Sequence, residues 1–208
     1  MFYLIHIIIS RLKVKKLLSK IPVRSLKNYL EIDFGSILAI LELGADINTR
    51  DLYGQTILHE IAREWHTDVA KFFIQNGGNV NLPDFYGRTA LHVAAWADYA
   101  EMVEFLIENG ADIEAVTSHD GEKLVNCDVK VPGQLQTPLH FAAGSDSKAA
   151  CKVLIENGAN IEARDYKNRT PLYIAAELDR SYSAQYLIDE NANATVKGFQ
   201  QITIVPGI

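Results

Sequence analysis

Apolar residues recur along the chain in pairs of short segments, and each segment keeps helical spacing. In the first segment of each pair a leucine lies four residues before an alanine, which puts a large and a small side chain on one helical face. The pairs are Leu58–Ala62, Leu91–Ala95, Leu139–Ala143 and Leu172–Ala176. The second segments read DVAKFFIQNG, AEMVEFLIENG, KAACKVLIENG and SAQYLIDEN. The pattern predicts repeated pairs of helices, packed closely where the alanines face the second helix.

The boundaries of these helices also recur at a fixed interval. Threonine precedes each first helix as a predicted N-cap, at Thr56, Thr89, Thr137 and Thr170. Glycine follows the second helix, where a left-handed C-cap is expected, and Asn191 is the next best residue at that place in the last copy. Gly44, Gly77 and Gly110 are 33 residues apart, as are Gly158 and Asn191. Only the interval from Gly110 to Gly158 differs, at 48 residues.

The period and the motifs resemble those of the ankyrin-repeat family. The full family motif occurs as Thr137-Pro138-Leu139-His140, and the other copies read TILH, TALH and TPLY, so Tyr173 departs from the pattern. The resemblance implies an all-α repeat solenoid of helix-turn-helix units joined by hairpin-like turns. It also implies that the motif histidine forms hydrogen bonds within and between turns. Asp98, Asp146 and Asp179 occupy a position that the family fills with glycine.

The period divides the chain into repeats with irregular ends. We expect an apolar and basic N-terminal segment at 1–17, a degenerate capping repeat at 18–50, ankyrin repeats at 51–83, 84–116, 117–164 and 165–197, and a truncated C-terminal tail at 198–208. The repeat at 117–164 contains 15 additional residues, located within SHDGEKLVNCDVKVPGQLQ at 118–136. Its alternation around Cys127 predicts an elongated hairpin. A tolerated surface loop is the other interpretation, since long turns cost little.

The net charge of −6 is unevenly distributed. Residues 1–30 contain seven basic side chains and no acidic one, whereas the remaining chain carries 13 basic and 26 acidic residues. Because an acidic body repels phosphate backbones, we expect no nucleic-acid partner. The apolar run Phe2 to Ile9 is too short for the roughly 20 residues that span a bilayer. Helical spacing continues at Val14, Leu17, Leu18 and Ile21, so we expect a helix that covers the end of the fold. A membrane-surface anchor is the second interpretation, and a misassigned start codon or a disordered tail is the third.

The histidines and cysteines do not form a recognisable catalytic or metal-binding motif. His59, His92 and His140 recur because the repeat recurs, and no C-x-x-C or H-x-x-x-H pair accompanies them. Cys127 could be drawn with a neighbouring histidine, but no third orienting group is indicated. We expect no catalytic residue, no metal and no cofactor, and therefore no enzyme. The two cysteines, Cys127 and Cys151, suit a reducing, cytoplasmic compartment.

The predicted function is to bind a protein partner, as the resemblance implies. In a repeat array the core positions are constrained, so recognition falls to variable positions along one extended face. The resemblance implies that these positions are the turn tips and the exposed side of each first helix. The predicted contact residues are Tyr53, Phe85, Tyr86 and Tyr166 at the tips and Glu60, Val93, Trp96, Phe141 and Ile174 on the concave side. The tip aromatics could instead pack against neighbouring tips and stiffen the array.

Three further expectations concern the setting of the protein. We expect a monomer in the cytoplasm, with a membrane-surface-tethered adaptor as the alternative function through the basic N-terminal segment. The divergent repeats, rich in isoleucine and asparagine, resemble those of intracellular bacteria, large DNA viruses or protozoa. By analogy, the protein is a candidate host-directed effector that is delivered into a host cell.

Overall fold

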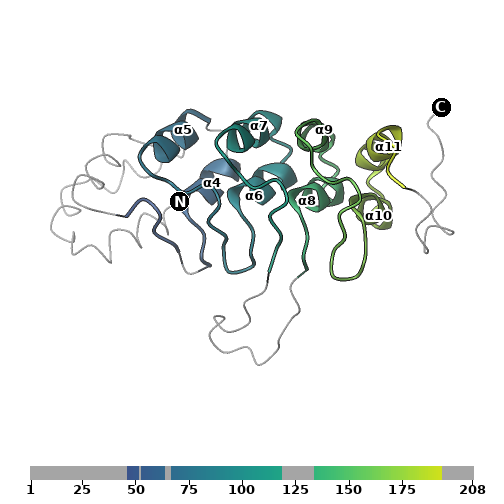
Figure 1. The fold of residues 1–208 in the computed structure, drawn as a ribbon, viewed down its shortest axis with the longest axis horizontal. Coiled ribbons are helices and arrows are strands. Elements are labelled where there is room, and N and C mark those ends of the chain that lie inside the picture. The colour runs from purple at the N-terminus through teal and green to yellow at the C-terminus, as the bar shows by residue number, and fades with distance from the viewer. Residues whose placement is uncertain (1–45, 52, 64–66, 119–133, 194–208) are drawn as a thin grey trace, which may run out of the picture.

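A computed structural model describes residues 46–51, 53–63, 67–118 and 134–193. These residues form eight helices in two rows, and the predicted all-α repeat solenoid is confirmed (Figure 1). The first row, called the inner helices here, contains α4 (Ile57–Arg63), α6 (Ala90–Trp96), α8 (Pro138–Gly144) and α10 (Pro171–Glu177). The second row, the outer helices, contains α5 (Thr67–Gln75), α7 (Ala100–Glu108), α9 (Lys148–Glu156) and α11 (Ser181–Asp189).

The core lies between the two rows and between successive helix pairs. Leu91, Leu139 and Leu172 of the inner helices are fully buried, as are the alanines predicted to face the outer helices. From the outer helices, Leu106, Leu154 and Leu187 close the core from the other side. Each repeat therefore buries its apolar face against its own partner helix and against the next repeat, as expected for a solenoid.

The helix ends adopt the conformations that the sequence predicts. Thr89, Thr137 and Thr170 have extended backbones at the N-caps of α6, α8 and α10. Gly110 and Gly158, which follow α7 and α9, have φ of 85° and 91°, and Asn191 after α11 has φ of 65°. Asparagine therefore takes the left-handed conformation in the last copy, as its short polar side chain allows.

The long turns between repeats extend to one side of the helices, opposite the outer row (Figure 1). The 15 additional residues enter one of these turns, and both flanking helix pairs are complete. At the base of the insertion the Thr117 N–H donates to the Gln136 carbonyl and the Leu135 N–H to the Thr117 carbonyl, both at 3.0 Å. The predicted hairpin within the insertion, the segments 1–17 and 18–45 and the tail at 198–208 lie outside the described residues.

Candidate functional site

The tip tyrosines and Trp96 form the most accessible part of the predicted contact set. Tyr53, Tyr86 and Tyr166 are 56%, 40% and 41% exposed, and Trp96 at the end of α6 is 56% exposed. A basic side chain stands over two of the tyrosine rings, with Arg88 5.1 Å from the Tyr86 centroid and Lys167 5.4 Å from that of Tyr166. These rings present both an apolar face and a nearby positive charge to solvent.

Two of the predicted contact residues are not available to a partner. Val93 and Ile174 were predicted to project to the concave side as contact residues, but they are only 7% and 5% exposed and offer little surface to a partner. Ile174 faces the preceding repeat: a methyl group placed on Gly144 would lie 3.3 Å from its Cγ2 atom. Glu60 and Phe141, at the equivalent position in other repeats, are half-buried. This position of the inner helix is thus covered by neighbouring side chains in every repeat, almost fully at Val93 and Ile174 and in part at Glu60 and Phe141.

Phe85 has the stiffening role that was one interpretation of the tip aromatics. Its ring packs on Gly54 of the preceding tip so closely that a Cβ atom there would lie 2.5 Å from the ring. Its N–H donates to the Tyr53 carbonyl at 2.9 Å, and Gly54 has a φ of 77°. Glycine is required at this tip for both reasons, since other residues disfavour positive φ and would clash. Phe85 joins neighbouring tips, while the tyrosines beside it stay exposed.

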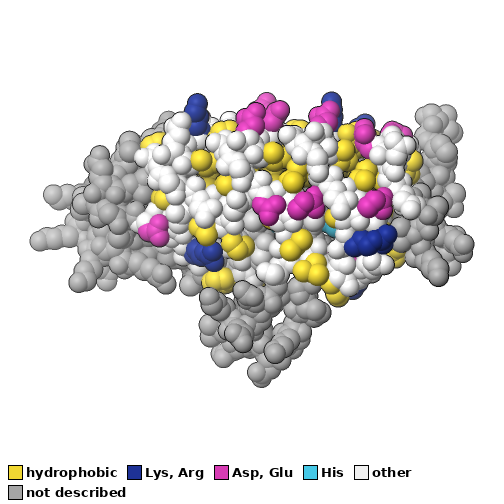
Figure 2. Space-filling view, in the orientation of Figure 1, with side chains coloured by type: hydrophobic (Ala, Val, Ile, Leu, Met, Phe, Trp, Pro, Cys, Tyr) yellow, Lys and Arg dark blue, Asp and Glu magenta, His cyan; other side chains and the backbone are white. Residues whose placement is uncertain are grey.

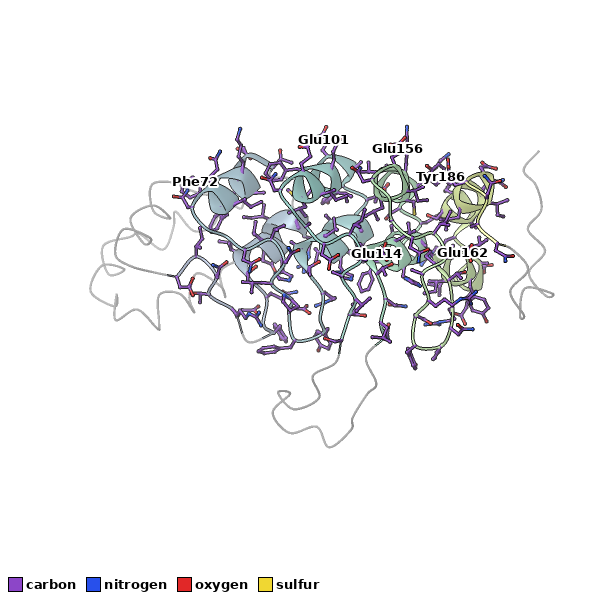
Figure 3. The ribbon with its side chains drawn as sticks, in the orientation of Figure 1. Phe72, Glu101, Glu114, Glu156, Glu162 and Tyr186 are labelled. Carbon is purple, nitrogen blue, oxygen red and sulfur yellow. The ribbon has the colours of Figure 1, made fainter. Side chains whose placement is uncertain are left out.

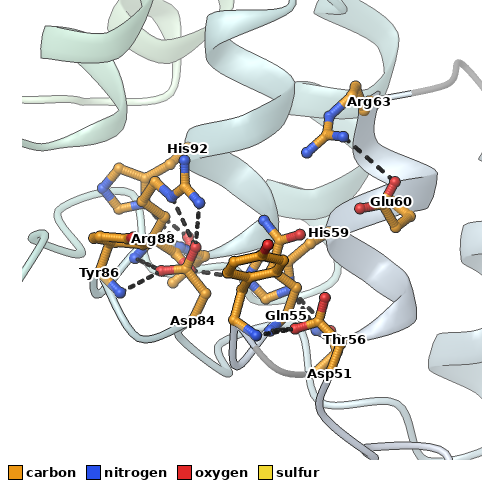
Figure 4. A network of polar contacts seen from close by, with 12 residues as sticks. Asp51, Gln55, Thr56, His59, Glu60, Arg63, Asp84, Tyr86, Arg88 and His92 are labelled. Atoms are coloured by element: carbon orange, nitrogen blue, oxygen red, sulfur yellow. Dashed lines mark hydrogen bonds and ion pairs between the residues drawn. The ribbon is translucent and has the colours of Figure 1, made fainter. Parts of the chain in front are cut away.

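The three motif histidines connect each repeat to the next one, and Figure 4 shows two of them, His59 and His92. The Thr89 N–H donates to Nδ1 of His92 at 3.1 Å, and the His92 Nε2 lies 3.0 Å from the Gln136 carbonyl of the next repeat. His59 and His140 bind the Arg88 and Arg169 carbonyls in the same way, at 2.8 and 3.0 Å. Since an amide only donates and a carbonyl only accepts, these contacts select the neutral tautomer with its proton on Nε2.

The environment of these histidines suits a structural role. Burial lowers the pKa of His59, His92 and His140, and for His92 the pKa falls to about 4. Both ring nitrogens are already occupied by backbone groups, so neither is placed to transfer a proton to a substrate. The role that the family resemblance implied for these residues agrees with the geometry. Burial also raises the pKa of the Cys151 thiol to about 12, which keeps it protonated and weakly nucleophilic.

An aspartate–arginine pair shapes two of the turns that carry the tip tyrosines. Asp84 accepts hydrogen bonds from the N–H groups of Tyr86 and Arg88 and pairs with the Arg88 guanidinium at 2.7 Å. Asp165 and Arg169 repeat the arrangement, with a 2.8 Å ion pair. Burial acts to raise the pKa of Asp165, but the hydrogen bonds and charge of Arg169 outweigh it and lower that pKa. These aspartate–arginine pairs hold the turns that carry Tyr86 and Tyr166 in one conformation.

Sequence reasoning missed the role of two aspartates that lie at a family glycine position. Asp98 and Asp146 have φ of 60° and 64°, in the region that glycine favours. Their carboxylates reach the following repeat, where Asp98 accepts from the Ala150 N–H at 2.9 Å and Asp146 from the Ser183 N–H at 2.8 Å. Each aspartate therefore caps the outer helix of the next repeat. The sequence does contain a signal for this role, because an aspartate recurs at the same position in successive repeats.

A second set of contacts between repeats runs along the turns that follow the outer helices (Figure 3). Asn81 donates to the Gly110 carbonyl at 2.9 Å and accepts from the Asp112 N–H at 2.8 Å. Glu114 and Glu162 stand at the same register and accept N–H groups of Asn160 and Asn193, at 2.7 and 2.6 Å. These contacts bind backbone polar groups of one repeat to side chains of the next along the array.

The described residues carry neither a metal-binding cluster nor a helix suited to span a membrane. They contain no group of three or more histidine, cysteine, aspartate or glutamate side chains arranged to hold a metal ion. No helix among them is long and apolar enough to cross a bilayer. The predictions about cofactors and about the N-terminal segment stay predictions.

A comparison of the sequence with known protein families agrees with the repeats that the structure shows. A family model described as ankyrin repeats, with three copies, matches residues 30–117 and 119–198 and so covers most of the chain. The matched ranges include every described helix. No curated protein matches the sequence.

Proposed function

The chain belongs to the ankyrin-repeat family, and on that premise we propose that it is a non-enzymatic module that binds a protein partner through its turn tips and inner helices. Ankyrin repeats are generally protein–protein interaction modules. The observation that carries the proposal is the exposure of Trp96, Tyr53, Tyr86 and Tyr166 on a scaffold whose junctions are bound internally. Tryptophan and tyrosine are enriched among the residues that dominate interface energies.

The exposed aromatics can contribute a substantial share of the free energy of binding. An indole side chain offers about 200 Å² of surface, and Trp96 leaves 56% of its area exposed. Covering that fraction removes ~110 Å² of mostly apolar area from water, which is worth about 3 kcal/mol. The tip tyrosines add rings with few rotatable bonds, so ordering them costs little entropy on binding.

The experiment starts from partner capture with the full chain, followed by mass spectrometry and calorimetric titration of the purified partner. A triple variant, Tyr53→Ala with Tyr86→Ala and Trp96→Ala, should bind at least tenfold more weakly and melt at an unchanged temperature. A matched control on the outer row, Glu101→Ala with Glu104→Ala, should bind like the wild type. Equal binding of the wild type and the triple variant would exclude this surface, and a lowered melting temperature would show that the aromatics stiffen the array instead.

The same proposal covers the cellular location, the class of partner and the oligomeric state. A reducing cytoplasm suits a chain whose described cysteine, Cys151, is a buried free thiol. The acidic residues of the described repeats, which line the outer-helix edge in Figure 2, disfavour nucleic acid as a partner. We propose a monomer, with a host protein as partner if the chain is delivered into a host cell. Fractionation of cells that express the tagged chain tests the location.

A membrane-tethered adaptor is the second candidate function. The observation that favours it is the charge of residues 1–30, which hold seven basic side chains and no acidic one. Each basic residue near an anionic membrane surface contributes about 1 kcal/mol. Flotation with liposomes that contain phosphatidylserine, using chains with and without residues 1–21, tests it. Equal recovery of both chains in the soluble fraction would rule out tethering.

A further inference from the structure

The last residues of the inner helices form one row across the array. This end row consists of Arg63, Trp96, Gly144 and Glu177, each at the C-terminus of α4, α6, α8 or α10. Because those helices pack side by side, the residues lie at successive positions along one edge. Trp96 is 56% exposed, and next in the row Gly144 has no side chain at all. The row therefore changes from a large exposed indole to bare backbone between the second and third repeats.

An exposed leucine lies on the far side of Gly144. A Cβ atom on Gly144 would lie 3.7 Å from Cδ1 of Leu178, which belongs to the fourth repeat and is 47% exposed. Trp96 and Leu178 are thus exposed apolar side chains on the two repeats that adjoin a position without a side chain. A single apolar side chain of a partner that contacts both would cover the Gly144 backbone as well.

A guanidinium with unused donors adjoins this position. The Nε of Arg180 donates to the Gly144 carbonyl at 2.9 Å, in the same way as the Ser147 hydroxyl binds the Trp96 carbonyl at 3.2 Å one repeat earlier. Serine has no donor left after that bond, whereas Arg180 keeps its two terminal nitrogens, for which no partner occurs among the described residues. Arg180 is half-buried, and a half-buried guanidinium gains from a carboxylate that can accept two bonds.

The acidic side chains near Arg180 do not fill this role. Glu177 in the end row is paired with Arg169 at 2.8 Å. Asp179 precedes Arg180 in sequence, but within the described part of the chain no ion pair joins them. A partner carboxylate at Arg180 could accept from these terminal nitrogens, and its charge is complementary to that of the guanidinium.

We propose that the edge formed by the second, third and fourth repeats at Trp96, Gly144 and Arg180 docks a peptide segment in which an apolar side chain adjoins a carboxylate. The apolar side chain seats between Trp96 and Leu178 over Gly144, and the carboxylate accepts hydrogen bonds from the terminal nitrogens of Arg180. This proposal rests on the proposed protein-binding function and names the chemistry of the partner. A basic or purely apolar segment would leave the Arg180 donors unbound, so this edge discriminates against both.

The test is selection of a random dodecapeptide library, displayed on phage, against the immobilised full chain. Enriched peptides should place Leu, Ile, Met, Phe or Trp within four residues of Asp or Glu. A synthetic peptide from this set, labelled for fluorescence anisotropy, should bind at least tenfold more weakly to Trp96→Ala. Replacing its acidic residue by the matching amide should weaken binding to the wild type at least fivefold. The same replacement should change binding to Arg180→Gln less than twofold.

Controls separate this proposal from loss of folding and from the wider function. Arg180→Lys keeps the charge and should retain more binding than Arg180→Gln, and melting curves identify a variant that fails to fold. If Arg180→Gln does not fold, the proposal is tested by the wild-type chain alone, with the peptide whose acidic residue is replaced by the matching amide. Binding that weakens less than fivefold would then overturn the proposal. Enrichment without acidic residues, or no enrichment above background, overturns the proposal. Binding that depends on Tyr53 and Tyr86 but not on Trp96 also overturns it, while leaving protein binding at the tips intact.

Discussion

Protonation of His92 is expected to weaken the fold as the pH falls from 6.5 towards 4. Burial lowers the pKa of this imidazole to about 4, from an ordinary value of 6.5. The unfolded chain therefore takes up the proton first, so the stabilising contribution is complete above about pH 6.5 and is lost on acidification. His59 and His140 have pKa values lowered in the same direction and by the same cause, so they add to the effect.

The size of the His92 contribution follows from its pKa. At about 1.4 kcal/mol for each pH unit, a change from 6.5 to about 4 corresponds to ~3.4 kcal/mol of unfolding free energy. By pH 4.5 about 2.5 kcal/mol of this is lost, because the unfolded state is then fully protonated and the folded state only in small part. The lowered pKa of Asp165 removes stability only below about pH 4, outside this window.

The assay is urea unfolding at pH 7.5, 6.5, 5.5 and 4.5, followed by circular dichroism, for the wild type and for His92→Gln. Glutamine at this position can still accept the Thr89 N–H, as in a capping box, but it does not titrate. Between pH 7.5 and 4.5 the wild type should lose about 2.5 kcal/mol more than the variant. Parallel stability profiles for the two chains, at equal dependence on urea, would refute the reasoning.

Three further predictions concern the junctions and the core. Asp146→Ala should lower the unfolding free energy by about 2 kcal/mol, because it removes the cap of α11 and places alanine at a φ of 64°. Asp146→Gly also removes the cap but tolerates this φ, so it should lower the unfolding free energy by only about half as much. Gly54→Ala should lower the melting temperature by several degrees through the clash with the Phe85 ring, and an unchanged temperature would contradict the tip contact. Cys151, tested in a Cys127→Ser background, should react with a thiol reagent at pH 8 only at the rate of unfolding, because burial raises its thiol pKa to about 12. Rapid reaction of the folded chain would show that the outer helix opens.

The features that the sequence predicted correctly depend on interactions within a single repeat. Helix positions, threonine N-caps and left-handed C-caps are set by residues close together in the chain, so the period of 33 residues was sufficient to locate them. The exposure of Tyr53, Tyr86 and Trp96 also followed, because tips and helix ends lie at the surface in any packing of such units. The sequence pattern could not show which of the tip aromatics would pack against the neighbouring tip.

What only the tertiary structure decided is how successive repeats meet. The rotation of one repeat against the next buries Val93 and Ile174, lays Phe85 on Gly54, and brings Asp98 and Asp146 to the helix ends of the following unit. The same stacking brings Leu178 and Arg180 to Gly144 and sets Trp96 at the end of the neighbouring inner helix, so that residues of three repeats lie along one edge. The sequence alone determined the unit and its period, because those rest on local hydrogen bonds and helical spacing. The surface presented to a partner was decided by contacts between units, which residue spacing within one unit does not encode.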